Sequence, residues 1–459
     1  MNSIDRKDRV LHEQVVLVGV LLPQSSKRDE DEPLLELAGL AKTAGAIVVD
    51  ELLQRRETPD KTTYIGKGKV DELKLMVEGQ DADCVIFDND LGPAQVRNLE
   101  KAIGVKVLDR TELILDIFAN RAQTHEARLA VELAQLQYSL PRLKRMWTHL
   151  SRLKMGIGMR GPGEKQLEVD RRLVERRIHQ LKTSLDGILR RKGRQIEGRR
   201  GHLTVSLVGY TNAGKSTLLN TLTDSEAEAK DKLFTTLVTK TRRWHLPGWG
   251  PVLLSDTVGF IRDLPHHLIA SFEATLEETI QADLLLHVVD VSSPTADEQI
   301  AAVNQVLKDL GIEEKKTLLV LNKLDAIEDP ATRANLKNRY PQGVFISAKA
   351  GEGIQELAFC VSEALSRDFL ELDVEAPIEN GRLIAYLADK GEVLSKQYDE
   401  STARIHCRIP KEFIGPVERE AEKIHYRSLT NGHPADHATH ETNGNNGHAA
   451  ETNKEEGEF

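Results

Sequence analysis

The sequence predicts an α/β protein in which two regions of alternating strands and helices flank a long helical region. Strand-like apolar runs alternate with amphipathic segments over residues 13–109 and again over residues 201–368. Between them, residues 110–200 lack strand signals and repeat apolar residues at gaps of three and four. Residues 372–427 predict a small appended α/β unit, and the tail 428–459 is expected to be disordered, because its last 30 residues contain no Leu, Ile or Val.

The N-terminal region, residues 13–109, contains four apolar runs typical of strands and three helix-like segments. In chain order these are EQVVLVGVLL, LLELAGLAKTAG, AIVVDELLQ, VDELKLMVEG, ADCVIFDN, PAQVRNLEKAIG and VKVLD. Gly45 is the expected stop of the first helix. Strict alternation of strand and helix predicts a small parallel sheet.

The helical region contains two apolar seams that predict an antiparallel hairpin. The seams are Leu129, Leu133, Leu136, Leu140 and Leu143, then Val174, Ile178, Leu181, Leu185 and Ile188. A glycine-rich basic loop, residues 155–168, is expected to join the two helices. Residues 141–200 carry 18 Lys plus Arg against 6 Asp plus Glu, although the chain as a whole has a net charge of -10. Such segregation is typical of phosphate-backbone binding, and a solvated helical face is the alternative.

The third region begins with a phosphate-binding loop. The apolar strand TVSLV runs directly into a glycine-containing turn, and a Leu-rich helix follows. We expect the turn's backbone N–H groups to bind phosphate, Lys215 to reach the β and γ oxygens, and Ser216 to offer its hydroxyl to Mg²⁺. The predicted loop residues are Gly209, Tyr210, Thr211, Asn212, Ala213, Gly214, Lys215, Ser216 and Thr217.

Two downstream motifs predict that the base is guanine. Asn322, Lys323 and Asp325 stand in NKLD directly after a buried strand, and Ser347-Ala348-Lys349 follows the strand VFI. A carboxylate at Asp325 accepts the ring N–H and the exocyclic amine of guanine. Adenine offers no such pair of donors, so a charged group would be left desolvated.

Two loops are expected to sense the γ-phosphate. In VLLSDTVGF, Asp256 would hold a Mg²⁺-bound water and the Gly259 N–H would contact the γ-phosphate. In FTTL, we choose Thr236 over Thr235 as a second magnesium ligand. Lys215, Thr236 and Gly259 are therefore the predicted catalytic groups. The neighbouring nucleotide contacts are expected to be Phe234, Thr235, Leu237, Thr257 and Val258.

Composition excludes several classes of protein. No run of 18 apolar residues occurs, and MNSIDRKDRV lacks the apolar core of a secretory signal. The three cysteines show no metal-ligand spacing. We therefore expect a cytoplasmic protein without membrane spans or structural zinc.

Several segments resemble the HflX family of ribosome-associated GTPases, within the translation-factor-like P-loop class. They are YIGKGKVDEL, FDNDLGPAQVRNLE, DRTELILDIFANRAQTHEARLAVELAQLQYSLPRL, RGPGEKQLEVDRR, DTVGFIRDLPHHL and SFEATLEE. The chain has FTTLVTKT where the family usually has FATLDPT, and EKQLEVD where it usually has ETQLETD. The implied architecture is a P-loop GTPase domain with an N-terminal parallel α/β domain, a basic helical hairpin and a small C-terminal unit.

The resemblance implies a GTP hydrolase that binds GTP or GDP with Mg²⁺ and docks on the large ribosomal subunit. Its GTP state would split or rescue stalled ribosomes, and the free protein is expected to be monomeric. Contacts with ribosomal RNA phosphates are assigned to Arg152, Lys154, Arg160, Arg171 and Arg172. The alternatives are a GTPase of ribosome assembly or RNA modification, and an RNA-binding scaffold that keeps GTP as a structural ligand.

A missing glutamine predicts slow hydrolysis. Signalling GTPases place a water-orienting glutamine directly after DxxG, but Phe260 occupies that position here. His266 and His267 are considered as bases, with a structural or partner-contact role favoured. The GKGK sequence that begins at Gly66 is either a phosphate grip or a strand-to-helix turn.

Overall fold

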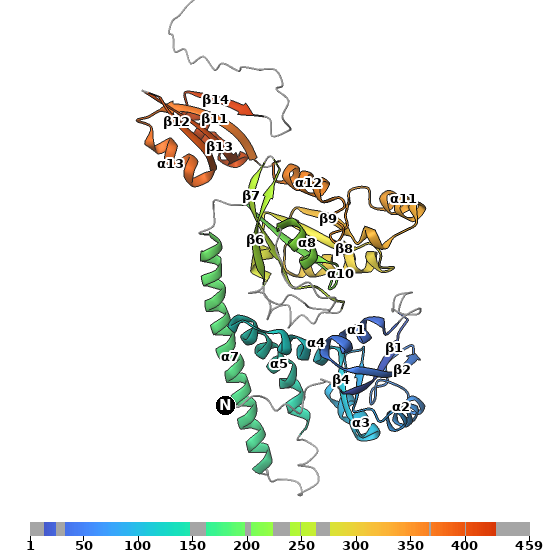
Figure 1. Cartoon of the computed structure of the whole chain (residues 1–459). Helices are drawn as coiled ribbons and strands as arrows, with labels where there is room; N and C mark the ends of the chain where they lie inside the picture. The colour runs from blue at the N-terminus through green and yellow to red at the C-terminus, as the bar shows by residue number, and fades with distance from the viewer. Residues whose placement is uncertain are drawn as a thin grey trace, which may run out of the picture. The chain divides into compact units, whose positions relative to one another are not determined.

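The computed structural model describes most of the chain (Figure 1). The described residues are 13–23, 33–146, 162–197, 203–223, 239–247, 249–262, 276–366, 369–399 and 401–427. Contacts divide the chain into two compact units, residues 1–365 and 366–459.

The first unit begins with a four-stranded parallel sheet in the order β2-β1-β3-β4. The strands are β1 (Gln14–Leu21), β2 (Ile47–Arg55), β3 (Cys84–Phe87) and β4 (Lys106–Asp109). They lie where the apolar runs predict them. The expectation of a parallel N-terminal α/β domain is therefore confirmed.

Helices cover both faces of this sheet, as the near-continuous apolar strands require. Val15 and Leu17 pack in one cluster with two of these helices, α1 (Leu35–Ala44) and α4 (Arg110–Arg121). Val16 and Val18 pack in another with α2 (Lys67–Gln80) and α3 (Pro93–Ile103). Gly45 ends α1 with a φ of 94°, the left-handed conformation that glycine adopts without strain.

Two long helices follow, α5 (His125–Met146) and α7 (Pro162–Glu197). Their apolar seams share one cluster that includes Leu133, Leu181 and Leu185. The Arg177 guanidinium binds the Glu132 carboxylate from helix to helix over 2.7 and 2.9 Å. The expected loop 155–168 is wrong in its second part, because α7 already begins at Pro162. Proline suits a first helical turn, where its missing N–H costs no hydrogen bond.

The third part of the first unit is a six-stranded sheet in the order β10-β9-β8-β5-β7-β6. All neighbouring pairs are parallel except β6 with β7. The strands are β5 (Thr204–Gly209), β6 (Lys240–Leu246), β7 (Gly250–Asp256), β8 (Leu284–Asp290), β9 (Thr317–Asn322) and β10 (Val344–Phe345). The helices are α8 (Lys215–Thr223), α10 (Ala296–Asp309), η3 (Leu324–Ala326), α11 (Pro330–Arg339) and α12 (Ile354–Ser366).

The second unit contains an antiparallel sheet in the order β12-β13-β11-β14. The segment LIAYLA lies in one of its helices, a second helix ends at Glu420, and KIHYR then forms the last strand. The elements are β11 (Phe369–Pro377), α13 (Gly381–Lys390), β12 (Glu392–Tyr398), β13 (Thr402–Pro410), η4 (Lys411–Phe413), α14 (Ile414–Glu420) and β14 (Lys423–Arg427).

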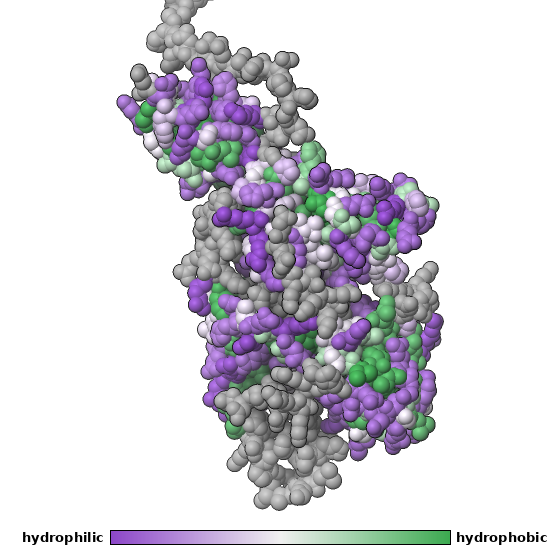
Figure 2. Space-filling view, viewed as in Figure 1, coloured by the Kyte–Doolittle hydropathy of each residue, from purple (hydrophilic) through white to green (hydrophobic). Residues whose placement is uncertain are grey.

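The visible surface of the described residues is mainly hydrophilic, with an apolar patch over the N-terminal domain (Figure 2). Among the described residues, none of the helices combines the length and the apolar character needed to cross a membrane.

Candidate functional site: the phosphate loop and the base pocket

The phosphate loop lies between the end of β5 at Gly209 and the start of α8 at Lys215. The Lys215 ammonium donates to the backbone oxygens of Gly209 and Tyr210 over 2.9 and 2.8 Å. Burial lowers the pKa of Lys215 to about 8, although the negative charge of Asp256 opposes the shift. An ammonium has three N–H donors, so Lys215 keeps one for a phosphate oxygen while the loop holds the other two.

Asn322 joins the phosphate loop to both base-recognition motifs. Its amide nitrogen donates to the Ala213 oxygen over 2.8 Å, and its amide oxygen accepts from the Ala348 N–H over 2.9 Å. Gly214 has a φ of 92°, and a Cβ there would lie 2.2 Å from the Asn322 amide nitrogen. Only glycine therefore fits beside this side chain, and the close approach holds the three motifs together.

Asp325, the predicted acceptor for the base, lies in η3. The Ser347 hydroxyl donates to Oδ1 of Asp325 over 2.6 Å, and the Thr221 hydroxyl donates to the Ala348 oxygen over 2.7 Å. Lys323 adopts a φ of 65° and pairs with Asp290 over 2.8 Å. A non-glycine residue in this conformation is held there by its surroundings. The NKLD and SAK segments thus lie together, as the sequence predicts from strand ends at one sheet edge.

Two of the predicted magnesium ligands, Ser216 and Asp256, lie among the described residues, and their side chains are in contact. The Ser216 hydroxyl donates to Oδ2 of Asp256 over 2.6 Å, and Asp256 is fully buried at the end of β7. A hydroxyl oxygen and a carboxylate are the hard oxygen ligands that Mg²⁺ prefers. This donor set fits the ion.

The DTVG segment lies against the phosphate loop. The Phe260 N–H donates to the Gly209 oxygen over 3.1 Å, and the Thr211 N–H donates to the Phe260 oxygen over 2.7 Å. A Cβ at Gly259 would lie 2.8 Å from the Thr211 methyl group and 3.2 Å from the Lys215 amine. The absence of a side chain at Gly259 therefore lets the segment approach the place expected for the γ-phosphate.

Phe260 is 2% exposed and belongs to the large apolar cluster of the first unit. Its ring has no hydrogen-bonding group, and its burial directs it into the core. The segment contributes its backbone to the phosphate loop and its aromatic ring to packing.

Several sequence-predicted residues lie outside the described residues. These are Phe234, Thr235, Thr236 and Leu237 of the FTTL loop that is expected to sense the γ-phosphate, Arg152, Lys154 and Arg160 of the basic loop, and His266 and His267. Arg171 and Arg172 lie on α7, where Arg171 pairs with Glu175 over 2.8 Å. Their assignment to RNA remains a prediction.

The GKGK sequence begins α2 and contains no glycine with positive φ. The Gly66 N–H donates to the Gln54 side chain over 2.8 Å, and the half-buried Lys69 pairs with Glu72 over 2.8 Å. These contacts are those of a strand-to-helix turn.

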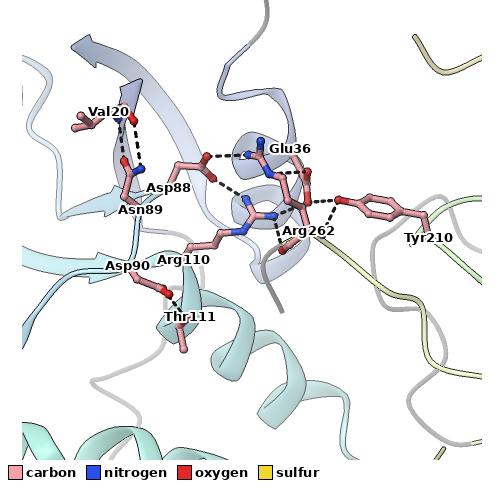
Figure 3. A network of polar contacts seen from close by, with 9 residues as sticks. All are labelled: Val20, Glu36, Asp88, Asn89, Asp90, Arg110, Thr111, Tyr210 and Arg262. Carbon is pink, nitrogen blue, oxygen red and sulfur yellow. Dashed lines mark hydrogen bonds and ion pairs between the residues drawn. The ribbon is translucent and has the colours of Figure 1, made fainter. Parts of the chain in front are cut away.

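Sequence reasoning missed the residues that support the site from elsewhere in the fold. Asp290 fixes Lys323, Thr221 fixes Ala348, and a polar network from the N-terminal domain meets Tyr210 (Figure 3). Asp290 ends the strand LLLHVVD, and its position at a strand end was the one available signal.

Three family descriptions match successive parts of the chain. Residues 31–119 match "GTP-binding GTPase N-terminal", residues 121–199 match "GTP-binding GTPase Middle Region", and residues 204–323 match "50S ribosome-binding GTPase". Together they cover the N-terminal domain, the helical hairpin and most of the nucleotide-binding domain.

Curated relatives match over most of their length. GTPase HflX of Caldanaerobacter subterraneus subsp. tengcongensis is 45% identical over 403 residues, which are 86% of this chain and 92% of that protein. GTPase HflX of Escherichia coli is 46% identical over 376 residues, or 81% of this chain and 87% of that protein. The chain therefore belongs to the HflX family of GTPases, which hydrolyse GTP to GDP and phosphate.

Proposed function

We propose that this GTPase binds the large ribosomal subunit and that its GTP-bound state splits or rescues stalled ribosomes. The observation that carries the proposal is the match of residues 204–323 to a family described as "50S ribosome-binding GTPase". The basic hairpin gives independent support, because a ribosomal partner presents RNA phosphates.

The described part of α7 has the form expected of an RNA-facing helix. Leu181, Leu185 and Ile188 are buried, so its apolar stripe is used in packing. Several of its described basic side chains are exposed instead. Those that are exposed are Arg172, Arg176, Arg177, Lys182, Arg190 and Arg191. Together with the predicted contacts Arg152, Lys154, Arg160 and Arg171, they would bind phosphate without reading base sequence.

We propose that Mg²⁺ is held by Ser216, by Asp256 through water and by Thr236. The 2.6 Å contact between the Ser216 hydroxyl and Asp256 supports this assignment. The ion would neutralise charge that develops on the phosphate oxygens. Lys215 would stabilise the β and γ oxygens, and the Gly259 N–H would contact the γ-phosphate.

We infer that Asp325 selects guanine, with Lys349 against the ring. Ser347 supports Asp325, and Asn322 holds the Ala348 N–H beside the pocket. A fixed carboxylate matches the two donors of guanine, and it loses less entropy on binding than a mobile one would.

Hydrolysis by the isolated protein is expected to be slow, on the order of 10⁻³ s⁻¹ or less, because Phe260 cannot orient water. Large subunits would accelerate it by immobilising the switch loops or by supplying a polar group. Single-turnover hydrolysis of GTP with and without purified large subunits measures this effect. Equal rates would contradict ribosomal stimulation.

The ribosomal role is tested by sedimentation. Intact ribosomes are incubated with the full chain and a non-hydrolysable GTP analogue, and the profile is compared with GDP. We expect the protein to migrate with the large subunit and the intact-ribosome peak to decrease. If the peaks do not shift and no protein migrates with the large subunit, the ribosomal proposal is wrong.

The same sedimentation assay addresses RNA contact through its salt dependence. Replacing Arg160 and Arg171 by Ala should reduce the slope of affinity against salt by about two phosphate contacts. Arg339→Ala, an exposed arginine of α11, is the matched control. An unchanged slope in the double variant would place the RNA surface elsewhere.

A further inference from the structure

A polar network joins the N-terminal domain to the phosphate loop and to the segment after DTVG (Figure 3). The Tyr210 hydroxyl donates to Glu36 of α1 over 2.8 Å and accepts from the Arg262 N–H over 2.7 Å. The Arg262 guanidinium donates to Asp88 over 3.0 Å. The Tyr210 side chain therefore contacts both α1 and the segment that follows Gly259, while the Tyr210 backbone belongs to the phosphate loop.

Arg110 completes the network from the start of α4. Its guanidinium donates to Asp88 over 2.6 Å and pairs with Glu36, and it also approaches the Arg262 backbone oxygen. The side chain of Arg110 is 3% exposed. Burial alone would lower the pKa of Arg110, but the Glu36 and Asp88 carboxylates more than offset it and raise the pKa. Two guanidinium groups thus balance two carboxylates.

This balance makes the arrangement difficult to displace. Removing one member of a buried charged pair leaves its partner desolvated, so the charges favour one mutual position of the segments that carry them. Burial and Glu36 together raise the pKa of Tyr210, so its hydroxyl stays protonated and donates to Glu36. The Tyr210 hydroxyl therefore has one proton for Glu36 and a lone pair for the Arg262 N–H.

The network lies within a few residues of the group that would contact the γ-phosphate. Arg262 follows Gly259 by three residues, and Phe260 between them is bonded to Gly209 and Thr211. The apolar cluster around Phe260 and Ile261 also contains Leu113 and Ile117 of α4. A displacement of the Gly259 backbone would therefore also displace the Arg262 N–H. The hydrogen bond from this N–H to the Tyr210 hydroxyl opposes such a movement.

We propose that Tyr210 and Arg262 are positioning residues through which the N-terminal domain holds the DTVG segment against the phosphate loop, coupling that domain to the γ-phosphate. GDP has no γ-phosphate, so the coupling acts on GTP and not on GDP. Linkage is reciprocal: whatever binds the N-terminal domain and shifts α1 changes the preference for GTP over GDP. The proposal rests on GTP binding and needs no ribosome.

Tyr210→Phe in the full chain removes the hydroxyl and keeps the ring. We expect affinity for a non-hydrolysable GTP analogue to fall by about threefold to tenfold and affinity for GDP to change by less than about twofold. Tyr340→Phe removes a hydroxyl bound to Asp297 in the same domain and is the matched control, with both affinities unchanged. Equal weakening of both nucleotides would indicate a merely structural role and overturn the proposal, as would unchanged or tighter binding of the analogue.

Hydrogen exchange provides a second measurement that needs no variant. In the unmodified chain, replacing GDP with the GTP analogue should change the protection of amides in α1, and Tyr210→Phe should reduce that change. Identical protection of α1 in the two nucleotide states would overturn the coupling. Because neither experiment contains ribosomes, failure here leaves the ribosomal proposal untouched.

Discussion

The hydroxyl of Ser347 and the carboxylate of Asp325 are 2.6 Å apart, and their hydrogen bond joins the two segments that flank the expected base. These residues are separated by 22 positions in the chain, and each follows a different strand of the same sheet. The bond orients the carboxylate before any nucleotide arrives.

Asp325→Asn should abolish the preference for guanine. The amide would present one donor where guanine also presents a donor, so we expect GTP affinity to fall at least about tenfold, as for a hydrogen bond to a charged group. Xanthine has an oxygen in place of the exocyclic amine, so affinity for xanthosine triphosphate should rise. Calorimetry with GTP, ATP and XTP measures this, with Asp297→Asn as control. A retained preference for GTP would contradict the assignment of Asp325.

Ser347→Ala tests the support given to Asp325 and not the acceptor itself. Loss of one hydrogen bond should weaken GTP and GDP equally, by about threefold to tenfold, because both contain the same base. Equilibrium titration with each nucleotide measures the effect. A loss confined to GTP would place Ser347 in γ-phosphate sensing instead.

Nucleotide binding should become coupled to proton uptake near pH 8. Burial lowers the pKa of Lys215 to about 8 in the nucleotide-free protein, and bound phosphates favour the charged ammonium. Above pH 8 the lysine is largely neutral before binding, so GTP binding takes up a proton and affinity falls. Calorimetry at pH 9 in buffers of different ionisation enthalpy detects the proton. Lys215→Met should eliminate it, and an uptake that persists in this variant would assign it to another group.

His287 should make stability fall in acid. Burial first, and then the charge of Lys215, lower the pKa of His287 to about 4 from 6.5. The unfolded chain binds a proton below pH 6.5, whereas the folded chain does so only near pH 4. The free energy of unfolding is therefore unaffected by His287 above pH 6.5. It decreases by about 3 kcal/mol as pH falls from 6.5 toward 4.

The thermal midpoint of His287→Leu should accordingly depend less on pH between 6.5 and 4 than that of the unmodified chain. His245→Gln is the control, because His245 is exposed on β6. If the His287 variant keeps the full acid sensitivity, another group is responsible.

Glu112 should act in the opposite direction. Burial first, and then Asp109, raise the pKa of Glu112 to about 7 from 4.5. The Tyr138 hydroxyl donates to Asp109 over 2.7 Å and lies 3.3 Å from Glu112, to which it also donates. The folded chain retains a proton that the unfolded chain loses above pH 4.5. The free energy of unfolding is therefore highest below pH 4.5 and decreases as pH rises toward 7.

Glu112→Gln keeps a neutral donor at all pH values. Above pH 7 the variant should be more stable than the unmodified chain by about 2–3 kcal/mol. Below pH 4.5 the two proteins should agree, which provides the internal control. Denaturant unfolding at several pH values measures the difference, and a variant that is less stable at pH 8 would show that Glu112 is needed as a carboxylate.

Features that depend on short spacing along the chain can be predicted from the amino-acid sequence alone. Alternation of strands and helices, the phosphate loop, and the motifs around Asp325 and Ser347 require only local periodicity and a known strand end. The end of the basic loop is the exception: Pro162 and its neighbouring glycine predict a break in the helix, but α7 begins at this proline, which a first helical turn tolerates.

The distant side chains that support the site, in contrast, can be identified from the folded structure only. Tyr210 meets Glu36, and Arg262 meets Asp88, each pair separated by 174 positions. A charged residue at the start of a helix looks the same in the sequence whether its side chain faces solvent or a buried partner. Charge pairing across such separations depends on how domains pack, and no local periodicity encodes that packing.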